Sequence, residues 1–222
     1  MNAAYFLTGT DTEIGKTFAS CALLHAWRAQ GLSAVGYKPV AAGTELIDGE
    51  WSNEDARQLQ QASSPGFSLA QINPICLRAA IAPHLAAQLE ARPITLAPIL
   101  QGFAQLRTQA ERIVVEGVGG FRVPLGKDFD SADLAVELGL PVILVVGLRL
   151  GCINHALLSV EAISARGLTL AGWIGNTLQP EMSRLSENLQ TLRELLPAPC
   201  LGVLPHIASS DSACAAAFVN AR

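Results

Sequence analysis

Short apolar runs recur along this chain, and longer stretches with helical periodicity separate most of them. The apolar runs are continuous rather than alternating, which is typical of strands that are buried on both faces of a parallel sheet. The runs that predict strands are 3–8, 33–38, 112–117, 141–147, 170–176 and 200–205. The stretches that predict helices are 16–30, 55–62, 84–91, 97–109, 131–138, 154–166 and 181–196.

Strand–helix alternation along the whole chain indicates βαβ crossovers and an open, mostly parallel sheet with helices on both faces. Gly31 and Gly167 directly follow two of the predicted helices, at the position where a left-handed residue commonly ends a helix. The length of 222 residues fits one α/β domain that spans 1–222. Segment 40–83 departs from the pattern with many polar and turn residues, and such long insertions are more often functional than idle.

Amino-acid composition argues against several classes of protein and of binding partner. Half of the residues are apolar, 15% are charged and the net charge is −4, with no cluster of Lys or Arg. We therefore expect neither nucleic acid nor an anionic membrane as a partner. The five cysteines are scattered, which suits reduced thiols in a cytoplasmic protein without a disulfide framework or zinc site. The longest apolar run, 140–147, is too short to span a bilayer, and Trp27, Trp51 and Trp173 are expected to be packing residues.

The first predicted strand runs into the glycine-rich turn FLTGTDTEIGKTFAS, residues 6–20. Its end matches the phosphate-binding P-loop, in which backbone N–H groups surround phosphate oxygens, a lysine reaches the β- and γ-phosphates, and a hydroxyl binds Mg²⁺. Lys16 and Thr17 hold the last two positions, although Gly9 and Gly15 are separated by five residues instead of the usual four. The alternative is an ordinary strand-to-helix turn with a chance GKT. The strand before the turn and the helix after it favour the phosphate site.

Charged residues at the ends of other strands support this site. Glu116 ends strand 112–117, where P-loop proteins place a carboxylate that helps to hold Mg²⁺, although alone it would be an ordinary strand-end residue. Lys38, one of three lysines, ends strand 33–38 at the sheet edge where such folds bind ligands. Asp55 is a third candidate for the metal shell, or equally a helix N-terminal residue favoured by the helix dipole. The fold we predict is a P-loop NTPase-like three-layer sandwich.

Several blocks taken together are similar to the dethiobiotin synthetase family. They are TGTDTEIGKTFASCALL, GYKPVAAG, VEGVGG, PVILVVGLRLGCINHALL, GLTLAGWIGN and LGVLP, in this order between residues 6 and 205. The family's loop has the same five-residue spacer, so the resemblance implies that the wider loop is functional. It also implies a homodimeric enzyme that converts 7,8-diaminopelargonate (7,8-diaminononanoate), CO₂ and ATP to dethiobiotin, ADP and phosphate. The implied intermediates are a carbamate and a carbamic–phosphoric anhydride, in the penultimate step of biotin biosynthesis.

The resemblance implies a role for each matching residue. Lys38, Lys16 and Thr12 would be catalytic, and Thr17, Asp55 and Glu116 would bind Mg²⁺. The residues that would contact ATP are Glu13, Ile14, Gly15, Lys16, Thr17, Phe18, Asp55, Glu116, Gly117, Val118, Gly119, Asn176, Thr177, Pro205, His206 and Ile207. Among these, Asn176 would read adenine. The residues that would contact the diamine are Thr12, Lys38, Ala42, Cys152, Ile153 and Asn154. Of these, 152–154 would hold its carboxylate with backbone N–H groups across a dimer interface.

Four positions depart from the family's pattern. Ala42 and Ala82 stand where serine is common, so two hydroxyl groups near the substrate are missing. Thr177 replaces an aspartate after the adenine-reading asparagine, and the acidic residue expected near Ser212 is absent, with Asp211 beside it. These departures touch substrate and base recognition, whereas the phosphate and magnesium residues are all present.

Three other readings remain open. A nucleotide switch of the MinD/ParA-like group would carry a second lysine early in the loop and a membrane-binding helix, and neither is present. The synthetase half of an amidotransferase would need a glutaminase domain, for which 222 residues leave no room. A binding protein that has lost catalysis would be expected to have lost part of the set Lys16, Thr17, Lys38, Asp55 and Glu116.

Overall fold

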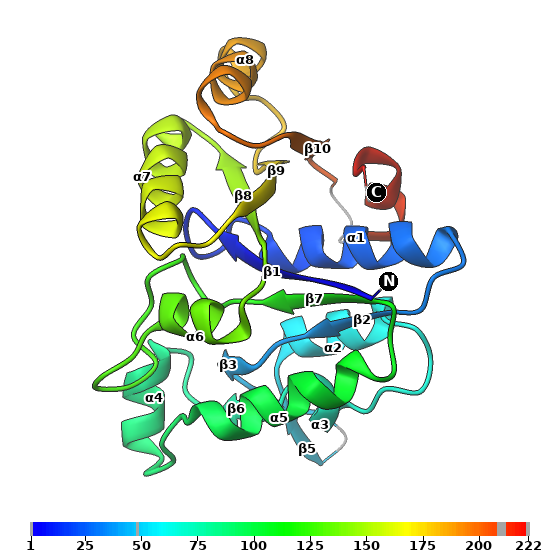
Figure 1. The fold of residues 1–222 in the computed structure, drawn as a ribbon, viewed down its shortest axis with the longest axis vertical. Helices are drawn as coiled ribbons and strands as arrows, with labels where there is room; N and C mark the ends of the chain where they lie inside the picture. Colours follow the sequence, from blue (N-terminus) through cyan, green and yellow to red (C-terminus); the bar gives the residue numbers. More distant parts are fainter. Residues whose placement is uncertain (1, 48, 208–211, 221–222) are drawn as a thin grey trace.

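A central sheet of parallel strands organises the molecule (Figure 1). The computed structural model describes residues 2–47, 49–207 and 212–220. Within these residues the strand order is β10–β9–β8–β1–β7–β2, and every neighbouring pair is parallel. The strands are β1 (Ala3–Gly9), β2 (Ala34–Tyr37), β7 (Arg112–Glu116), β8 (Val142–Leu148), β9 (Leu170–Thr177) and β10 (Cys200–Leu204). The predicted mostly parallel α/β sheet is confirmed.

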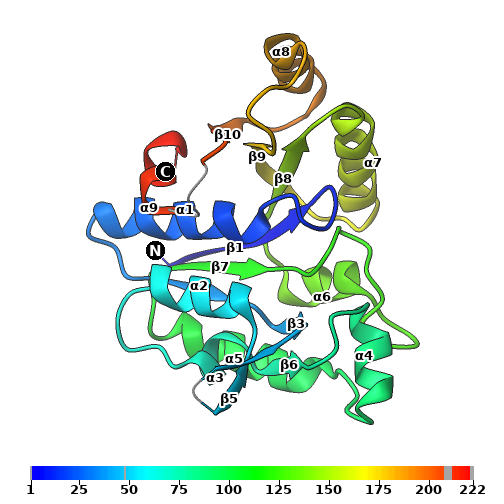
Figure 2. The ribbon, with the colours of Figure 1, turned by 180° about the vertical axis from the view of Figure 1, so that it is seen from behind.

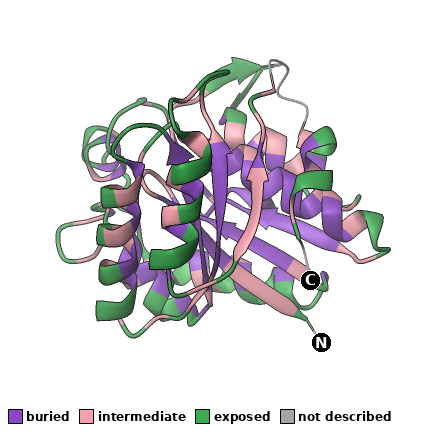
Figure 3. Ribbon diagram, turned by 90° about the horizontal axis from the view of Figure 1, so that it is seen from above, coloured by how far each residue is buried: buried purple, intermediate pink, exposed green. Residues whose placement is uncertain are grey.

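Helices cover both faces of this sheet, which makes a three-layer sandwich (Figure 3). On one face α1 contacts α2, α9 and the short 3₁₀ helix η1, and on the other α7 contacts both β8 and α8. Figure 2 shows the first group from behind. The helices are α1 (Lys16–Ala29), α2 (Glu54–Ala62), α3 (Leu69–Ile72), α4 (Pro83–Leu89), α5 (Leu96–Arg107), α6 (Ser131–Leu138), α7 (Cys152–Ala165), α8 (Leu185–Leu195), α9 (Ser212–Ala215) and η1 (Ala216–Phe218). The seven predicted helices are present, but α8 begins later than predicted because residues 181–184 form an irregular turn.

The side chains of β8 show why its apolar run is continuous. Ile143 and Val145 belong to the large core cluster that includes α1, whereas Leu144 and Val146 belong to a second cluster with α7 and α8. Successive side chains of a strand point to opposite faces. Both faces of β8 are therefore buried, as are all seven of its residues.

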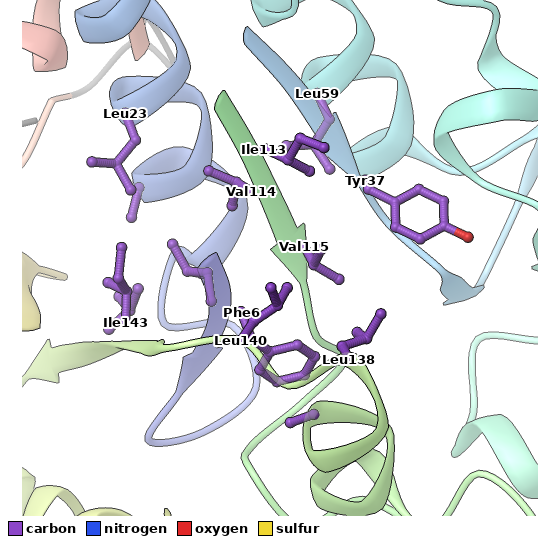
Figure 4. Packing of buried hydrophobic residues seen from close by; sticks show 14 of the residues in the cluster. Phe6, Leu23, Tyr37, Leu59, Ile113, Val114, Val115, Leu138, Leu140 and Ile143 are labelled. Carbon is purple, nitrogen blue, oxygen red and sulfur yellow. The ribbon is translucent and has the colours of Figure 1, made fainter. Parts of the chain in front are cut away.

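Large apolar side chains fill the space between the sheet and its helices (Figure 4). Leu23 of α1, Leu59 of α2 and Ile113 of β7 lie in one cluster of buried residues. Trp27 and Trp173 are buried as predicted, but Trp51 is 49% exposed and the Arg78 guanidinium lies 5.2 Å from its ring centroid. The prediction that Trp51 is a packing residue is therefore wrong, because it lies on a surface hairpin.

The irregular segment 40–83 contains short elements that the sequence pattern did not indicate. β3 (Val40–Ala42) pairs in parallel with β6 (Ile75–Leu77), and β4 (Glu45–Ile47) pairs antiparallel with β5 (Glu50–Ser52). Strands of three residues are too short to show periodicity. β3 follows β2 after only Lys38 and Pro39, so the β3–β6 pair begins just beyond the strand that leads to Lys38.

Candidate functional site

The predicted P-loop lies between the last residue of β1, Gly9, and the first residue of α1, Lys16. The N–H of Thr10 donates to the carbonyl of Val145 (2.9 Å), which ties the start of the loop to β8. The loop closes on two left-handed residues, Glu13 (φ 58°) and Gly15 (φ 82°). The loop therefore turns sharply into α1, whose first N–H groups lack partners within the helix, as an anion site requires.

The Lys16 ammonium is buried and lies over the loop. It donates to the carbonyl of Asp11 (3.0 Å), and the Asp11 carboxylate accepts from the N–H of Thr12 (2.8 Å) and pairs with Arg149. Burial, and then repulsion from Lys38, lower the pKa of Lys16 to about 8. Asp11 and Arg149 were missed by the sequence analysis, although Arg149 stands two residues before the GCIN motif.

The three residues predicted to bind a metal meet around Lys38. Glu116 is fully buried, and its Oε1 accepts from Thr17 Oγ1 (2.8 Å) and Lys38 Nζ (2.6 Å). Lys38 Nζ also lies 3.0 Å from Asp55 Oδ2. Four residues that are distant in sequence thus converge at the carboxyl edge of the sheet, next to the P-loop. Asp55 lies in the first turn of α2, as the helix-dipole alternative expects, and it also pairs with Lys38, whereas its place in a metal shell stays a prediction.

Charges in this cluster set each other's pKa. Burial by itself lowers the pKa of Lys38, but the carboxylates of Glu116 and Asp55 outweigh it and raise that pKa above its usual value. Burial likewise raises the pKa of Asp55, yet the adjacent Lys38 ammonium holds it below the usual range. At neutral pH the lysine is therefore a fixed positive charge, held by Glu116 and Asp55 beside the P-loop.

The glycine turn after β7 packs against the P-loop. Gly119 has φ 62°, and a Cβ there would lie 2.9 Å from Val123 Cγ2 and 3.5 Å from Thr12 Oγ1. Because the turn follows Glu116 directly, it holds Gly117, Val118 and Gly119 beside the loop. The predicted catalytic residue Thr12, which belongs to the P-loop, therefore faces this turn.

Asn176, near the end of β9, contacts the P-loop directly. Its Nδ2 donates to the carbonyl of Ile14 (2.8 Å), and the side chain is buried. A Cβ built on Gly15 would come within 2.2 Å of the same nitrogen. The amide retains a second N–H and a carbonyl oxygen for another partner. This residue therefore braces the loop, a function that the sequence analysis did not predict for it.

Known proteins are similar to this chain over almost its whole length. A family model described as an AAA domain matches residues 3–213. The ATP-dependent dethiobiotin synthetase BioD of Aromatoleum aromaticum is 63% identical over 217 residues, which cover 98% of this chain and 96% of that protein. The enzyme of the same name from Ralstonia nicotianae is 55% identical over 215 residues, covering 97% and 94%. The chain belongs to the ATP-dependent dethiobiotin synthetase family.

Solved structures with low sequence identity show that the fold of this family member is a P-loop NTPase fold. A ParA family ATPase from Chlorobium tepidum superposes with a TM-score of 0.60 at 11% identity, covering 97% of this chain and 89% of that one. The MinC:MinD complex of Aquifex aeolicus gives 0.56 at 12% identity, covering 93% and 82%. The predicted fold class is confirmed.

The other residues expected to contact the diamine, and Ala82, which stands where serine is common in the family, lie on three further elements. Ala42 ends β3, Ala82 caps α4, and 152–154 begin α7 after Gly151 (φ 93°). The N–H of Cys152 donates to the carbonyl of Arg149 (3.0 Å), so this donor is already used within its own loop. The predicted carboxylate site therefore rests on the N–H groups of Ile153 and Asn154.

Further positions expected to contact ATP lie at the end of β9 and just after β10. Thr177 is the last residue of β9, and the segment Pro205, His206 and Ile207 follows β10, the strand that pairs with β9. Ile207 packs partly buried against the large core cluster. Asp211 lies outside the described residues. The base of a nucleotide on the P-loop would thus meet side chains from the β9–β10 edge of the sheet.

The donor set suits a hard divalent cation. Thr17 offers a hydroxyl, while Glu116 and Asp55 offer carboxylates, and the positive Lys38 ammonium already lies between the two carboxylates. In the described ranges, no group of three or more His, Cys, Asp or Glu residues is arranged to hold a metal by protein ligands alone. A nucleotide-associated metal fits these observations, because such an ion takes several of its ligands from phosphate and water.

Proposed function

We propose that this chain is a dethiobiotin synthetase, which closes the ureido ring of dethiobiotin from 7,8-diaminopelargonate and CO₂ with hydrolysis of ATP to ADP and phosphate. The observation that carries the proposal is the convergence of Thr17, Lys38, Asp55 and Glu116 beside the P-loop. Family membership supplies the substrate class. The activity is assigned to one domain that spans residues 1–222.

The reaction needs positioning and charge neutralisation more than covalent help. One amine of the substrate adds to CO₂ and forms a carbamate. The γ-phosphoryl group of ATP passes to a carbamate oxygen, giving a carbamic–phosphoric anhydride and ADP. The second amine attacks the carbonyl carbon, phosphate leaves, and the ring closes. Lys16 and Lys38 neutralise the oxyanions of this sequence, and Thr12 orients the carbamate.

The metal of this reaction is Mg²⁺ in our proposal. Thr17, Glu116 and Asp55 would hold it, and the ion would neutralise charge on the β- and γ-phosphates. The ammonium of Lys38 pairs with the carboxylates of Glu116 and Asp55. Lys38 therefore contributes a positive charge within reach of both the metal position and the position of the substrate.

Assembly and location complete the proposal. A homodimer would bring the N-terminus of α7 of one protomer to the diamine site of the other, where its N–H groups hold the substrate carboxylate. Across the described ranges, no helix combines the length and apolar character that a membrane crossing requires. We assign the protein to the cytoplasm, with small molecules as partners and neither nucleic acid nor membrane among them.

The proposal is tested by mixing the protein with Mg-ATP, bicarbonate and 7,8-diaminononanoate, omitting each component in turn. We expect ADP to form only with the complete mixture. The product should be heavier than the diamine by one carbonyl group less two hydrogens, as measured by mass spectrometry. Release of ADP that ignores both the diamine and bicarbonate would reject the synthetase and favour a nucleotide switch.

Binding of nucleotide should become proton-coupled in alkaline solution because of Lys16. Its pKa of about 8 in the free protein lies below its unfolded value, so the ammonium is lost as the pH rises through 8. Phosphate bound beside Lys16 favours the charged form, so ATP binding should be accompanied by proton uptake that grows from pH 7 to pH 9. Affinity should fall over the same interval.

Calorimetric titration of ATP in buffers of different ionisation enthalpy measures this uptake. The Lys16→Arg variant is the control, since a guanidinium stays charged throughout this range. The variant should take up few protons when it binds ATP, at every pH in this interval. An equal uptake in the two proteins would assign the proton to another group. The same lowered pKa means that the folded protein, without nucleotide, should gain stability as the pH rises from 8 toward 10.

A further inference from the structure

Both oxygens of the buried Glu116 carboxylate have partners, and one of these partners has no role in the proposed reaction. Oε1 accepts from Thr17 and Lys38, whereas Oε2 accepts from Ser20 Oγ at 2.6 Å. Ser20 and Glu116 are both 0% exposed. We infer that Ser20 is a positioning residue, which fixes the Glu116 carboxylate so that Oε1 faces the metal and the phosphates.

The position of Ser20 on α1 explains how it reaches the carboxylate. Ser20 follows Thr17 by three residues, so the two hydroxyls lie on the same face of α1, above the end of β7. Its neighbours Ala19, Cys21 and Ala22 are all buried and have no such bond to Glu116. A buried serine within a helix often bonds back to its own helix. This one donates to a strand 96 residues away, and an alanine there would favour the helix more.

The two oxygens of the carboxylate have different tasks. In the proposed reaction the Thr17 hydroxyl binds the metal and the Lys38 ammonium turns to the carbamate and phosphoryl oxygens. Both would then give up part of their contact with Oε1. Among the described residues that donate hydrogen bonds to Glu116, Ser20 has no other partner in the proposed reaction, so its bond to Oε2 can persist throughout. It keeps the carboxylate from rotating when the other two partners turn away.

This inference rests on the metal role of Glu116 in the proposed function, and a direct metal titration tests it. With ADP present, Mn²⁺ is titrated against the protein and the free ion is measured by electron paramagnetic resonance. Loss of a residue that orients a metal ligand typically weakens metal binding by 10–100-fold, and we expect about tenfold for Ser20→Ala. The affinity for ADP without metal should be unchanged. In turnover, the half-saturating Mg²⁺ concentration should rise while the KM of the diamine stays constant.

A second buried serine provides the matched control. Ser63 is 4% exposed, and its Oγ donates to the carbonyl of Leu59 at 2.6 Å and accepts from the N–H of Gly36 at 3.0 Å. Ser63→Ala removes a donated bond of the same length and also the bond from Gly36, so it should lower stability and leave Mn²⁺ binding unchanged. Ser20→Thr keeps the hydroxyl and should restore binding. If Ser20→Ala fails to fold, Ser20→Cys keeps nearly the same volume with a weaker donor, and it should bind Mn²⁺ less tightly than the wild type.

Two results would overturn the inference. One is an unchanged Mn²⁺ affinity in the folded Ser20→Ala or Ser20→Cys protein, and the other is an equal loss in Ser63→Ala. Glu116→Gln separates this inference from the proposal on which it rests. If Glu116→Gln also leaves Mn²⁺ binding unchanged, Glu116 is not a metal ligand and the proposed site itself fails. If it weakens Mn²⁺ binding while the Ser20 variants do not, only the positioning role of Ser20 is rejected.

Discussion

Replacing Lys38 by methionine should lower turnover by about 10²–10³-fold, the loss seen when one preorganised donor to a developing oxyanion is removed. The lysine is 3% exposed and its ammonium is held between Glu116 and Asp55, so no water or other side chain takes its place without rearrangement. ADP binding through the P-loop should persist. Steady-state kinetics with the diamine, together with ADP titration, measure the two quantities.

The same substitution should destabilise the protein in the absence of ligands. It leaves the buried Glu116 carboxylate without its charged partner, and breaking such a pair typically costs about 3–5 kcal/mol. Lys127→Met is the control, because Lys127 is an exposed lysine on the loop before α6. That variant should match the wild type in both turnover and stability. A Lys38→Met protein that is folded, binds ADP and still turns over at the wild-type rate would remove Lys38 from the mechanism.

Replacing Gly15 by alanine should strongly weaken productive binding of ATP. Gly15 has φ 82°, and an added Cβ would come within 2.2 Å of Asn176 Nδ2, so the loop or β9 must shift. A displacement of about 1 Å at a phosphate site can reduce catalysis by about 10²-fold, and we expect at least that loss in kcat/KM for ATP. The bond from Asn176 to the Ile14 carbonyl should be lost with it. ATP titration and steady-state kinetics check this result.

The variant Gly31→Ala distinguishes the two possible causes of that loss, which are the left-handed backbone conformation and the clash with Asn176. It has φ 80°, almost the same backbone conformation, but an added Cβ would meet nothing within 4 Å. Gly31→Ala should therefore show only the cost of a left-handed alanine, about 1–2 kcal/mol of unfolding free energy, with normal affinity for ATP. If both variants lose stability equally and both bind ATP normally, contact between Gly15 and Asn176 does not limit the site.

Much of the site could be predicted from the sequence, because its residues stand at the ends of predicted strands. Parallel strands end at the same edge of a sheet, so Lys38 and Glu116, as strand-end residues, could be predicted to meet at the P-loop before the fold was seen. The strands themselves were readable because burial on two faces demands continuous apolar runs, as β8 shows. Asp55 remained ambiguous, since a helix N-terminus and a metal shell favour the same carboxylate.

Other features depend on contacts that no local pattern records. Asp11 pairs with Arg149 across 138 positions, and Ser20 bonds to Glu116 across 96. A serine within an apolar helical pattern does not indicate which group accepts its hydrogen bond, because the acceptor lies on a strand far away in the sequence. The short β3–β6 and β4–β5 pairs were likewise missed, because three residues show no period and their stability comes from pairing with a distant partner.

The sequence by itself determined the layered fold, the phosphate loop and the identities of the charged residues, because each follows from periodicity or from chemistry within a few neighbouring residues. Tertiary structure alone decided which of these groups pair with one another. It placed the Lys38 ammonium between two carboxylates, set Asn176 against the loop and directed Ser20 to the second oxygen of Glu116. The physical reason is that hydrogen bonds and charge pairs act over a few ångströms in space, whatever the separation along the chain.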